Sequence, residues 1–494
     1  MSLLLEKLAN SNPTAIALES KDGLMSYGML LAKVNHLALW LEQQQISSLS
    51  VYAENSIEWV IIDFACQKAG VIFTPIPLFF TPHQFENLIT TAKPDMILSD
   101  RALPCESIYD EKGQSIQGLS LTNYVLKAPA SDISLPIGTS KITFTSGSTG
   151  RPKGVCLSIE NQFNVATSLV DSIGLTKPRH LCLLPLPTLL ENIAGVYSPL
   201  LAGGTVIIAN DAERGFSGSR LVNPQQLLMC ISKVQPDSLI LVPELLQVLI
   251  HACEQGWSAP ATLKFIAVGG SKVSSSLITK ARALNLPVYQ GYGLSECSSV
   301  VSLCTPCKDD IESTGVLLPH LSAMIEHGEL VVEGNCFLGY VGDESSWYQK
   351  RTYTGDIAEI KQSKIYLTGR VKNIIINSFG RNISPEWVES EVLACGLFQQ
   401  SVLIGDAKPF CLMILVPINS EIPTKLIEQA IVAINASLPD YAQIKAQIVL
   451  EKPMQFEAGL YTSNGRPKRD AIGQYFKSEI DSYYVNSSSN NLFA

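Results

Sequence analysis

Short apolar runs alternate with amphipathic segments through the first three quarters of the chain, and this alternation limits the folds open to it. Residues 51–54 and 71–75 are typical of buried strands, and residues 57–69 between them have a helical pattern. Further strands are predicted at 141–145, 180–184, 205–209, 238–242, 265–268 and 288–289, and further helices at 158–172, 224–234 and 274–284. This order predicts a largely parallel sheet covered by helices, with its binding site at the carboxyl ends of the strands.

The pattern changes after about Gly315. Residues 323–333 and 352–367 are typical of β-hairpins, and a further α/β segment extends to about residue 475. We therefore predict an α/β protein in which a large N-terminal domain, residues 1–370, combines helix-covered, mostly parallel sheets with a β-rich subdomain. Residues 371–480 are predicted to form a small mobile α+β domain, and residues 481–494, rich in Ser and Asn, a disordered tail.

Charge and hydropathy exclude several classes of function. The 494 residues include 36 Lys and Arg and 45 Asp and Glu, a formal net charge of −9, which argues against a general nucleic-acid binder. No apolar run reaches the roughly 18 residues of a membrane span, and the first residues lack the apolar stretch of a signal peptide. We expect a cytoplasmic protein, while its positive mean hydropathy leaves peripheral membrane contact open.

The segment TSGSTGRPKG, residues 145–154, carries the strongest chemical signal. It follows a predicted strand and precedes a predicted helix, and its glycines allow backbone N–H groups to approach a ligand closely. Hydroxyl groups and two cations complete a site suited to a polyphosphate, although the segment lacks the Gly-Lys-Ser/Thr ending of a Walker loop. The predicted binding residues are Thr145, Ser146, Gly147, Ser148, Thr149, Gly150 and Lys153.

This loop resembles the signature of the adenylate-forming (ANL) superfamily, which includes acyl-CoA synthetases, firefly luciferase and the adenylation domains of peptide synthetases. Further motifs resemble that family in its order: YQGYGLSE at 289–296, YTGD at 353–356 and SFGRNISPEWVE at 378–389. The wording of the last motif is similar to the long-chain fatty acyl branch. The resemblance covers nearly the whole chain.

The resemblance implies roles for residues of the central motifs. Gly269, Gly270 and Ser271 would border the adenine and the acyl pocket. Tyr292, followed by Gly293, would stack on adenine. Ser295, where the family usually has Thr, would contact the α-phosphate, and Glu296 would hold Mg²⁺, a cation that prefers carboxylate and phosphate oxygens.

The later motifs imply ribose, hinge and acyl-pocket residues. Asp356 and Arg370 would bind the ribose, and Lys372 would be the hinge between the domains. Thr188 and Leu189 would line the acyl pocket, with Thr188 replacing the His that is frequent in long-chain enzymes.

One position departs from the family's pattern. The segment YTSNGRPKR, residues 461–469, resembles Asn-Gly-Lys-x-x-Arg, in which the Lys bridges the substrate carboxylate and the α-phosphate. This chain has Arg466 there, with Lys468 two residues later. Arg binds anions through a planar fork rather than as a point charge, so an enzyme using Arg466, one using Lys468, and a chain without adenylation activity all remain open.

Together these features predict an AMP-forming acid–thiol ligase that uses ATP and Mg²⁺. It would activate an apolar carboxylic acid, a fatty acid in particular, as an acyl-adenylate and pass it to coenzyme A. An acyl carrier protein as acceptor, an aromatic acid as substrate, and a catalytically impaired nucleotide-binding homologue are the alternatives. We discount a zinc site at Cys297, Cys304 and Cys307 because a second ligand pair is missing, and no histidine triad is evident in the sequence.

Overall fold

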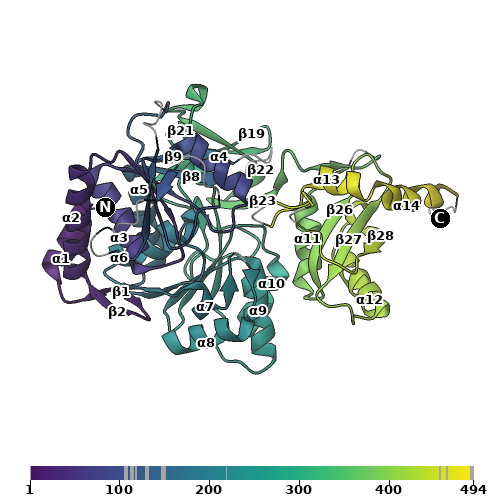
Figure 1. The fold of residues 1–494 in the computed structure, drawn as a ribbon. Coiled ribbons are helices and arrows are strands. Elements are labelled where there is room, and N and C mark those ends of the chain that lie inside the picture. The colour runs from purple at the N-terminus through teal and green to yellow at the C-terminus, as the bar shows by residue number, and fades with distance from the viewer. Residues whose placement is uncertain are drawn as a thin grey trace.

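The computed structural model describes residues 2–104, 109–111, 116, 119–127, 133–145, 152–218, 220–379, 381–455, 458–462 and 465–489 (Figure 1). The helices are α1 Ser2–Ser11, α2 Tyr27–Gln43, α3 Ile57–Ala69, α4 Pro82–Ala92, α5 Ile159–Ile173, α6 Ser198–Leu201, α7 Asp211–Arg214, α8 Pro224–Val234, α9 Pro243–Glu254, α10 Ser275–Ala283, α11 Pro385–Ala394, α12 Thr424–Asn435, α13 Arg469–Tyr475 and α14 Lys477–Ser489. A π-helix, η1, spans Glu191–Tyr197, and 3₁₀ turns occur at η2 Ser295–Cys297, η3 Glu344–Ser346 and η4 Asp440–Ala442.

The strands form two large sheets and three small ones. Those of the first half are β1 Ile16–Ser20, β2 Gly23–Ser26, β3 Ser48–Tyr52, β4 Ile72–Pro75, β5 Met96–Ser99, β6 Tyr109–Glu111, β7 Thr122–Leu126, β8 Lys141–Thr145, β9 Lys153–Leu157, β10 Arg179–Cys182, β11 Thr205–Ile208, β12 Phe216–Ser217, β13 Arg220–Leu221 and β14 Ser238–Leu241. Those of the second half are β15 Phe265–Val268, β16 Val288–Tyr292, β17 Ser302–Leu303, β18 Val316–Leu317, β19 Leu321–Glu326, β20 Glu329–Gly334, β21 Gly339–Tyr340, β22 Arg351–Lys361, β23 Lys364–Arg370, β24 Ile375–Ile376, β25 Asn382–Ile383, β26 Phe398–Ile404, β27 Cys411–Pro417 and β28 Ile444–Val449.

The predicted α/β architecture is confirmed, with a large N-terminal domain and a smaller C-terminal one (Figure 1). One sheet has the order β21-β9-β8-β4-β3-β5-β7-β6, with parallel pairing among β8, β4, β3 and β5. The other has the edge strand β2 and then the parallel strands β1, β11, β10, β14, β15 and β16. It continues into the antiparallel strands that were predicted as hairpins. The β-rich subdomain is therefore an extension of the second sheet.

Helix α3 illustrates why the apolar pattern predicted the elements so closely. Ser56 caps its first turn, accepting a hydrogen bond from the Trp59 N–H, and Gly70 ends it in the left-handed conformation. Most of its side chains are buried, because α3 packs against α2 as well as the sheet. Trp59 meets Phe73 of β4 edge to face, with ring centroids 5.3 Å apart.

A buried polar cluster supports the strand that leads into the predicted phosphate loop. Lys141, the first residue of β8, donates hydrogen bonds to Asp63 of α3 at 3.0 Å and to Tyr197 and Asn192 of η1 at 2.7 and 2.5 Å. Burial lowers the pKa of Lys141, and these partners satisfy its ammonium group inside the protein. The cluster thus joins β8, α3 and η1.

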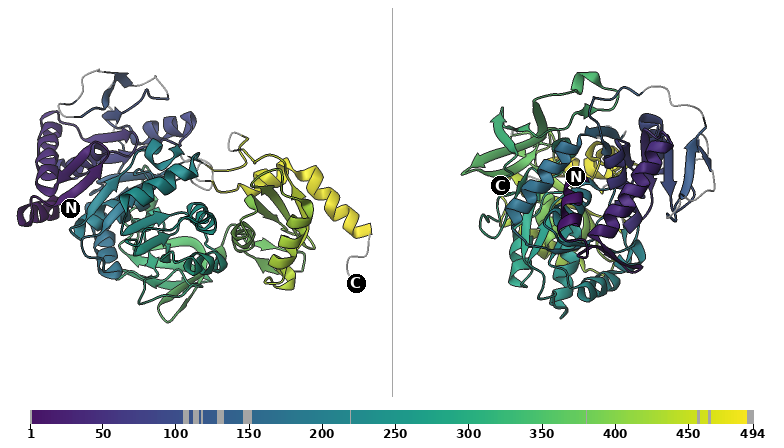
Figure 2. Two further views of the ribbon diagram at one scale, coloured as in Figure 1. Left: turned by 90° about the horizontal axis from the view of Figure 1, so that it is seen from below. Right: turned by 90° about the vertical axis from the view of Figure 1, so that its left-hand side faces the viewer.

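The C-terminal domain has its own core around β26, β27 and β28, with α11 and α12 packed against the strands. It lies beside the N-terminal domain, joined near β23, in Figure 1 and in the left view of Figure 2. The prediction of a disordered tail from residue 481 is wrong over most of its length, because α14 continues to Ser489. Ile480 and Tyr484 pack into the domain core, which offsets the low helix propensity of the Ser and Asn that follow.

Two local features also differ from the sequence reading. A strand that was not predicted, β9, follows the phosphate-loop segment and pairs antiparallel with β8 before helix α5 begins. Ser384 lies at the N-cap of α11, where a serine commonly caps a helix, but its side chain makes no capping hydrogen bond there. Among the described helices, none is both long and apolar enough to cross a bilayer.

Candidate functional site

A cavity of about 1600 Å³ lies between the carboxyl ends of the parallel strands and the C-terminal domain. Most of the predicted site residues line it, although they come from segments far apart in the sequence. From the N-terminal domain these are Thr145, Lys153, Thr188, Leu189, Gly269, Gly270, Tyr292, Gly293, Ser295, Glu296 and Arg370, and Lys372, Arg466 and Lys468 follow from the rest of the chain. Ser271 is exposed and is not among the lining residues.

The predicted ribose carboxylate, Asp356, holds two other predicted residues together. Tyr292 donates its hydroxyl to Asp356 Oδ2 at 2.7 Å, and Arg370 donates from Nε to Oδ1 at 2.8 Å. Burial and the neighbouring Asp356 charge raise the pKa of the Tyr292 phenol well above its usual value, so the hydroxyl stays a donor. Asp356 is buried while the Arg370 side chain is 44% exposed, so the arginine faces the cavity.

Gly293 is required by backbone packing. A Cβ at this position would lie 1.6 Å from the carbonyl oxygen of Ser299, a distance no side chain tolerates. The glycine thus lets the chain after β16 turn back closely against residue 299, which sets Ser295 and Glu296 on the cavity wall in the turn η2. Backbone packing alone therefore requires a glycine at this position of the motif, whether or not a ligand is bound.

Lys153, Tyr340 and Glu296 form a chain of contacts along one side of the cavity. The Lys153 ammonium lies 4.8 Å from the centre of the Tyr340 ring, and Tyr340 donates its hydroxyl to Glu296 Oε1 at 2.9 Å. Burial and the Glu296 charge raise the pKa of Tyr340. Glu296 Oε2 accepts no hydrogen bond from the described part of the chain. Sequence reasoning missed Tyr340, which reaches the site because β21 pairs with β9.

The ends of the predicted phosphate loop are fixed beside this chain of contacts. Thr145 and Lys153 are paired across the β8–β9 hairpin, so the intervening segment starts and ends at the cavity wall. The predicted residues Ser146, Gly147, Ser148, Thr149 and Gly150 lie outside the described residues.

The C-terminal domain brings Arg466 to the cavity. Its Nη2 donates to the Gly270 carbonyl oxygen at 2.9 Å, a contact between the two domains. The segment that carries it is held by a bridge between Tyr461 and Pro467. Desolvation in the cleft, followed by the nearby Arg370 charge, lowers the pKa of Arg466, although its surface is partly open to solvent.

Lys468 and Lys372 differ from Arg466 in that their side chains contact no polar partner in the described part of the chain. Lys468 precedes α13 and lines the cavity, and Lys372 is exposed in the turn that follows β23. Neither ammonium forms a hydrogen bond or ion pair with another described residue. The neighbour Arg469 is instead held by Glu389 of α11.

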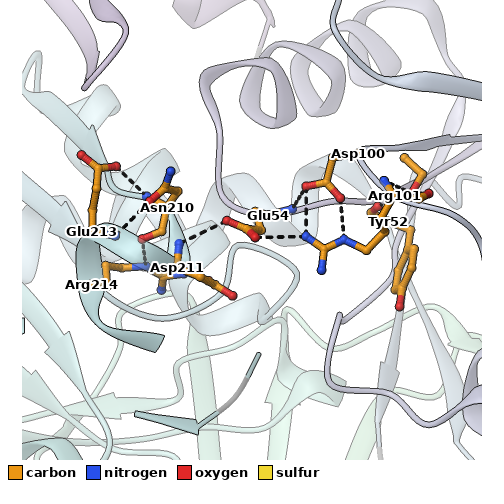
Figure 3. A network of polar contacts seen from close by, with 9 residues as sticks. Tyr52, Glu54, Asp100, Arg101, Asn210, Asp211, Glu213 and Arg214 are labelled. Carbon is orange, nitrogen blue, oxygen red and sulfur yellow. Dashed lines mark hydrogen bonds and ion pairs between the residues drawn. The ribbon is translucent and has the colours of Figure 1, made fainter. Parts of the chain in front are cut away.

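The segment carrying Thr188 and Leu189 is positioned by polar contacts that sequence reasoning missed. Asn55 donates to the Leu184 carbonyl at 2.9 Å and accepts from the Leu186 N–H at 2.8 Å. Buried Arg214 donates to the Leu183 carbonyl and belongs to the network of Figure 3. That network continues through Glu54 to Arg101, and so connects the ends of β3, β5 and β11.

Comparisons with known proteins agree with this arrangement. Residues 5–341 match the model of the AMP-binding enzyme family, and residues 372–488 match that of the AMP-binding enzyme C-terminal domain. Fold and site define a two-domain α/β protein with a cavity lined by residues of both domains. The chain belongs to the AMP-binding enzyme family.

Individual relatives extend the comparison. A 2-succinylbenzoate–CoA ligase of Staphylococcus aureus (strain Newman) is 27% identical over 444 residues, which cover 82% of this chain and 87% of the relative. A structure of an anthranilate CoA ligase with anthranoyl-AMP superposes with a TM-score of 0.78 at 15% identity, covering 96% of both chains. The Bacillus subtilis O-succinylbenzoate coenzyme A synthetase, in complex with ATP and magnesium ion, gives 0.73 at 21% identity, covering 94% of this chain and 98% of that one. These three relatives are not named for fatty acids, unlike the branch that residues 378–389 resemble.

The Tyr340–Glu296 contact gives a first test. Tyr340→Phe removes the hydroxyl but keeps the ring beside Lys153, so Glu296 loses one partner that orients it. We expect Mg·ATP binding to weaken about 2- to 10-fold, the loss of one hydrogen bond to a charged group. Isothermal titration with Mg·ATP measures this.

Tyr366→Phe is the matched control, because Tyr366 also donates to a carboxylate, Asp310, at 2.8 Å but does not line the cavity. It should bind Mg·ATP as the wild type does. Unchanged binding by the Tyr340 variant would contradict a role for this contact in the site.

Proposed function

We propose that this protein activates an apolar carboxylic acid with ATP and Mg²⁺ and transfers the acyl group to coenzyme A. The observation that carries the proposal is the convergence of Arg370, Glu296, Lys153 and Arg466 on one cavity with many apolar lining residues. Buried Asp356 lies behind the wall of this cavity and holds Tyr292 and Arg370. The family membership and the names of the relatives, which include CoA ligases, support the same reaction class.

In the first half-reaction, a carboxylate oxygen of the acid attacks the α-phosphorus of ATP. The bond from that phosphorus to the bridging oxygen breaks, and pyrophosphate leaves with its electron pair. Negative charge spreads over the phosphate oxygens, so catalysis depends on positioning and on cations aimed at that charge. We assign Lys153 and the loop at 145–150 to the β- and γ-phosphates, and Ser295 to the α-phosphate.

The nucleoside would be held by Tyr292, Asp356 and Arg370. The Tyr292 hydroxyl is fixed by Asp356, and Tyr292 lines the cavity together with Gly269 and Gly270, so adenine would stack on its ring beside this turn. Asp356 and Arg370 present complementary groups to the ribose hydroxyls. We propose that these three residues recognise the nucleotide before the acid reacts.

Glu296 fits a Mg²⁺ ligand. It lines the cavity, and the Tyr340 hydroxyl orients one carboxylate oxygen while the other has no partner among the described residues. A carboxylate paired with phosphate oxygens is the donor set that Mg²⁺ prefers. When bound, Mg²⁺ would neutralise charge on the phosphates, and Glu296 would hold it on the side facing Lys153.

Arg466 is the favoured cation for the reacting groups. It already reaches the Gly270 carbonyl across the domain boundary, so a short movement would bring it to an adenylate bound beside that turn. Lys468 lines the same cavity without a fixed partner and is the alternative. A nucleotide-binding homologue without activity remains the competing hypothesis, supported only by the substitution of Arg for Lys.

The acid is proposed to be apolar, and a fatty acid in particular. The chamber beyond Gly269 is lined mainly by apolar side chains of α5, the region of η1 and α6, and the central strands. Aromatic acids are the second candidate, because the named relatives include ligases of 2-succinylbenzoate and anthranilate. An acyl carrier protein is the alternative acceptor to coenzyme A.

The second half-reaction would follow a rotation of the C-terminal domain. A thiolate sulfur attacks the acyl carbon, the carbon–oxygen bond to AMP breaks, and AMP leaves. We propose the domain boundary between residues 370 and 371, with Lys372 as the hinge, because Lys372 is exposed in the turn that joins β23 to the C-terminal domain. Cytoplasmic location remains part of the proposal.

ATP–pyrophosphate exchange with a panel of carboxylic acids tests the function and the catalytic cation together. The wild type should exchange pyrophosphate in an acid-dependent manner. Arg466→Ala should lower kcat about 100-fold, because one cation aimed at the transition state is lost, with Mg·ATP affinity retained.

Lys468→Ala is the matched control and should change kcat less than about threefold. The reverse pattern would assign the catalytic role to Lys468. Mg·ATP binding without exchange for any acid would instead favour the inactive homologue.

Lys372→Pro tests the hinge. Proline fixes φ near −65°, which restricts the turn, and the substitution leaves the residues assigned to the nucleotide unchanged. The rate of adenylate formation, measured as pyrophosphate release in a single turnover, should stay within about threefold of the wild-type rate. The rate of thioester formation with coenzyme A should fall at least about tenfold. Lys372→Ala, which leaves φ free, should retain both steps. Equal loss of both steps in the proline variant would contradict the hinge assignment.

A further inference from the structure

The inner part of the cavity ends at a polar group of residues. Small and apolar side chains line its walls, including Ala194, Ala202, Ile240 and Ala267. Ser238 and His180 line the cavity at the beginnings of β14 and β10, whereas the Gly269–Gly270 turn follows the end of β15. Phe265, the register partner of Ser238, lies four positions before Gly269, which corresponds to about 13 Å of strand.

A chain of hydrogen bonds connects these two residues to a buried carboxylate. Ser238 Oγ lies 2.9 Å from His180 Nδ1, and His180 Nε2 lies 3.0 Å from Glu191 Oε1. Glu191 is fully buried, and its Oε2 accepts from the Leu184 N–H at 3.1 Å. A Cβ at Gly195 would lie 2.3 Å from Glu191 Oε1, so the glycine in η1 makes room for the carboxylate.

With Glu191 ionised, the His180–Glu191 pair carries either a negative charge or no net charge, depending on the protonation state of the imidazole. An ionised carboxylate only accepts hydrogen bonds, so His180 Nε2 donates to Glu191. With a neutral imidazole, Nδ1 accepts from the Ser238 hydroxyl and the pair carries a negative charge. With an imidazolium, Nδ1 donates to Ser238 and the pair is neutral. In both cases Ser238 can still form a hydrogen bond with a neutral polar group.

The rest of the inner chamber supplies no compensating cation. The lysine and arginine side chains that line the described cavity come from β9, β22, β23, the following turn and the C-terminal domain. None comes from α5, β10, η1, α6, β14, β15 or β16, the elements that enclose the inner chamber. A second carboxylate placed there would be desolvated near Glu191 without a cation to pair with.

The same residue types form nucleophilic triads in hydrolases, but this geometry argues against one. Ser238 lies in a central strand and is paired with His180 of β10 on one side and Phe265 of β15 on the other. The strand N–H groups around it are thus engaged in the sheet rather than arranged as an oxyanion hole.

We propose that Ser238, held by His180 and Glu191, is a specificity-determining residue that selects monocarboxylic acids whose distal end is uncharged. The site accepts an alkyl end, favours a neutral hydrogen-bonding group such as a hydroxyl, and rejects a second carboxylate. This inference rests on the proposed acid-activating function. It distinguishes the chain's substrates from 2-succinylbenzoate, an acid with two carboxylates.

The test compares acids of graded chain length in three matched forms, with a methyl, a hydroxyl or a carboxylate at the distal end. Acid-dependent pyrophosphate release gives KM and kcat for each acid. At the lengths that reach Ser238, wild-type protein should show a KM at least about tenfold higher for the dicarboxylic acid than for the alkyl acid. The hydroxy acid should have a KM equal to or below that of the alkyl acid.

Two variants assign the effect to the proposed residues. Ser238→Ala should raise the KM for the hydroxy acid about 2- to 10-fold relative to the KM for the alkyl acid. Glu191→Gln replaces the buried carboxylate with a neutral amide. It should reduce the difference in KM between the dicarboxylic and alkyl acids. The wild-type comparison stands even if the Glu191 variant does not fold.

The outcomes separate this inference from the function on which it rests. Equal KM values for dicarboxylic and alkyl acids, or a hydroxy acid that binds worse than the alkyl acid, would overturn the specificity role while leaving acid activation intact. Failure of every acid to release pyrophosphate would overturn the proposed function itself.

Discussion

The Asp356 carboxylate organises the site because it binds residues of two strands that are far apart in the sequence. Tyr292 ends the parallel strand β16, and Arg370 ends β23 at the edge of the C-terminal domain. By binding both, Asp356 fixes the wall of the nucleotide cleft to the point where the domains join. The rotation proposed for the C-terminal domain about the following turn would leave Tyr292 in place.

Buried polar contacts position the other walls in the same manner. Lys141 ties the strand leading into the phosphate loop to α3 and η1, and Asn55 holds the backbone that leads to Thr188. Such groups are costly to bury unless they are fully paired, and here each pairing spans separate elements. The cavity is consequently bounded by backbone segments with defined positions, which favours recognition of a substrate by shape.

The sequence was sufficient for elements whose pattern is local. Helix α3 has caps at both ends and an apolar run of helical length, and strand β15 ends at a Gly-Gly turn, so both were predicted with their observed bounds. Helix α14 was missed because its Ser and Asn content suggests disorder, whereas tertiary packing of Ile480 and Tyr484 decides its structure. Local composition does not report such packing.

The candidate site shows the same division between local and long-range information. Motif residues such as Tyr292, Asp356 and Arg466 could be named because they occur in characteristic strings. The group of Ser238, His180 and Glu191 could not, since His180 and Ser238 are 58 residues apart and meet only through the pairing of β10 with β14. Tyr340 likewise could not be predicted, because it reaches the site only through the pairing of β21 with β9.

The most direct test of the account is a crystal structure of the protein with Mg²⁺ and ATP. We expect adenine against Tyr292, the ribose at Asp356 and Arg370, and the triphosphate along the turn that begins at Thr145, with the α-phosphate on the side of Glu296 and Arg466. A triphosphate bound elsewhere in the molecule, away from that turn, would contradict the central claim that this cleft activates a carboxylic acid by adenylation.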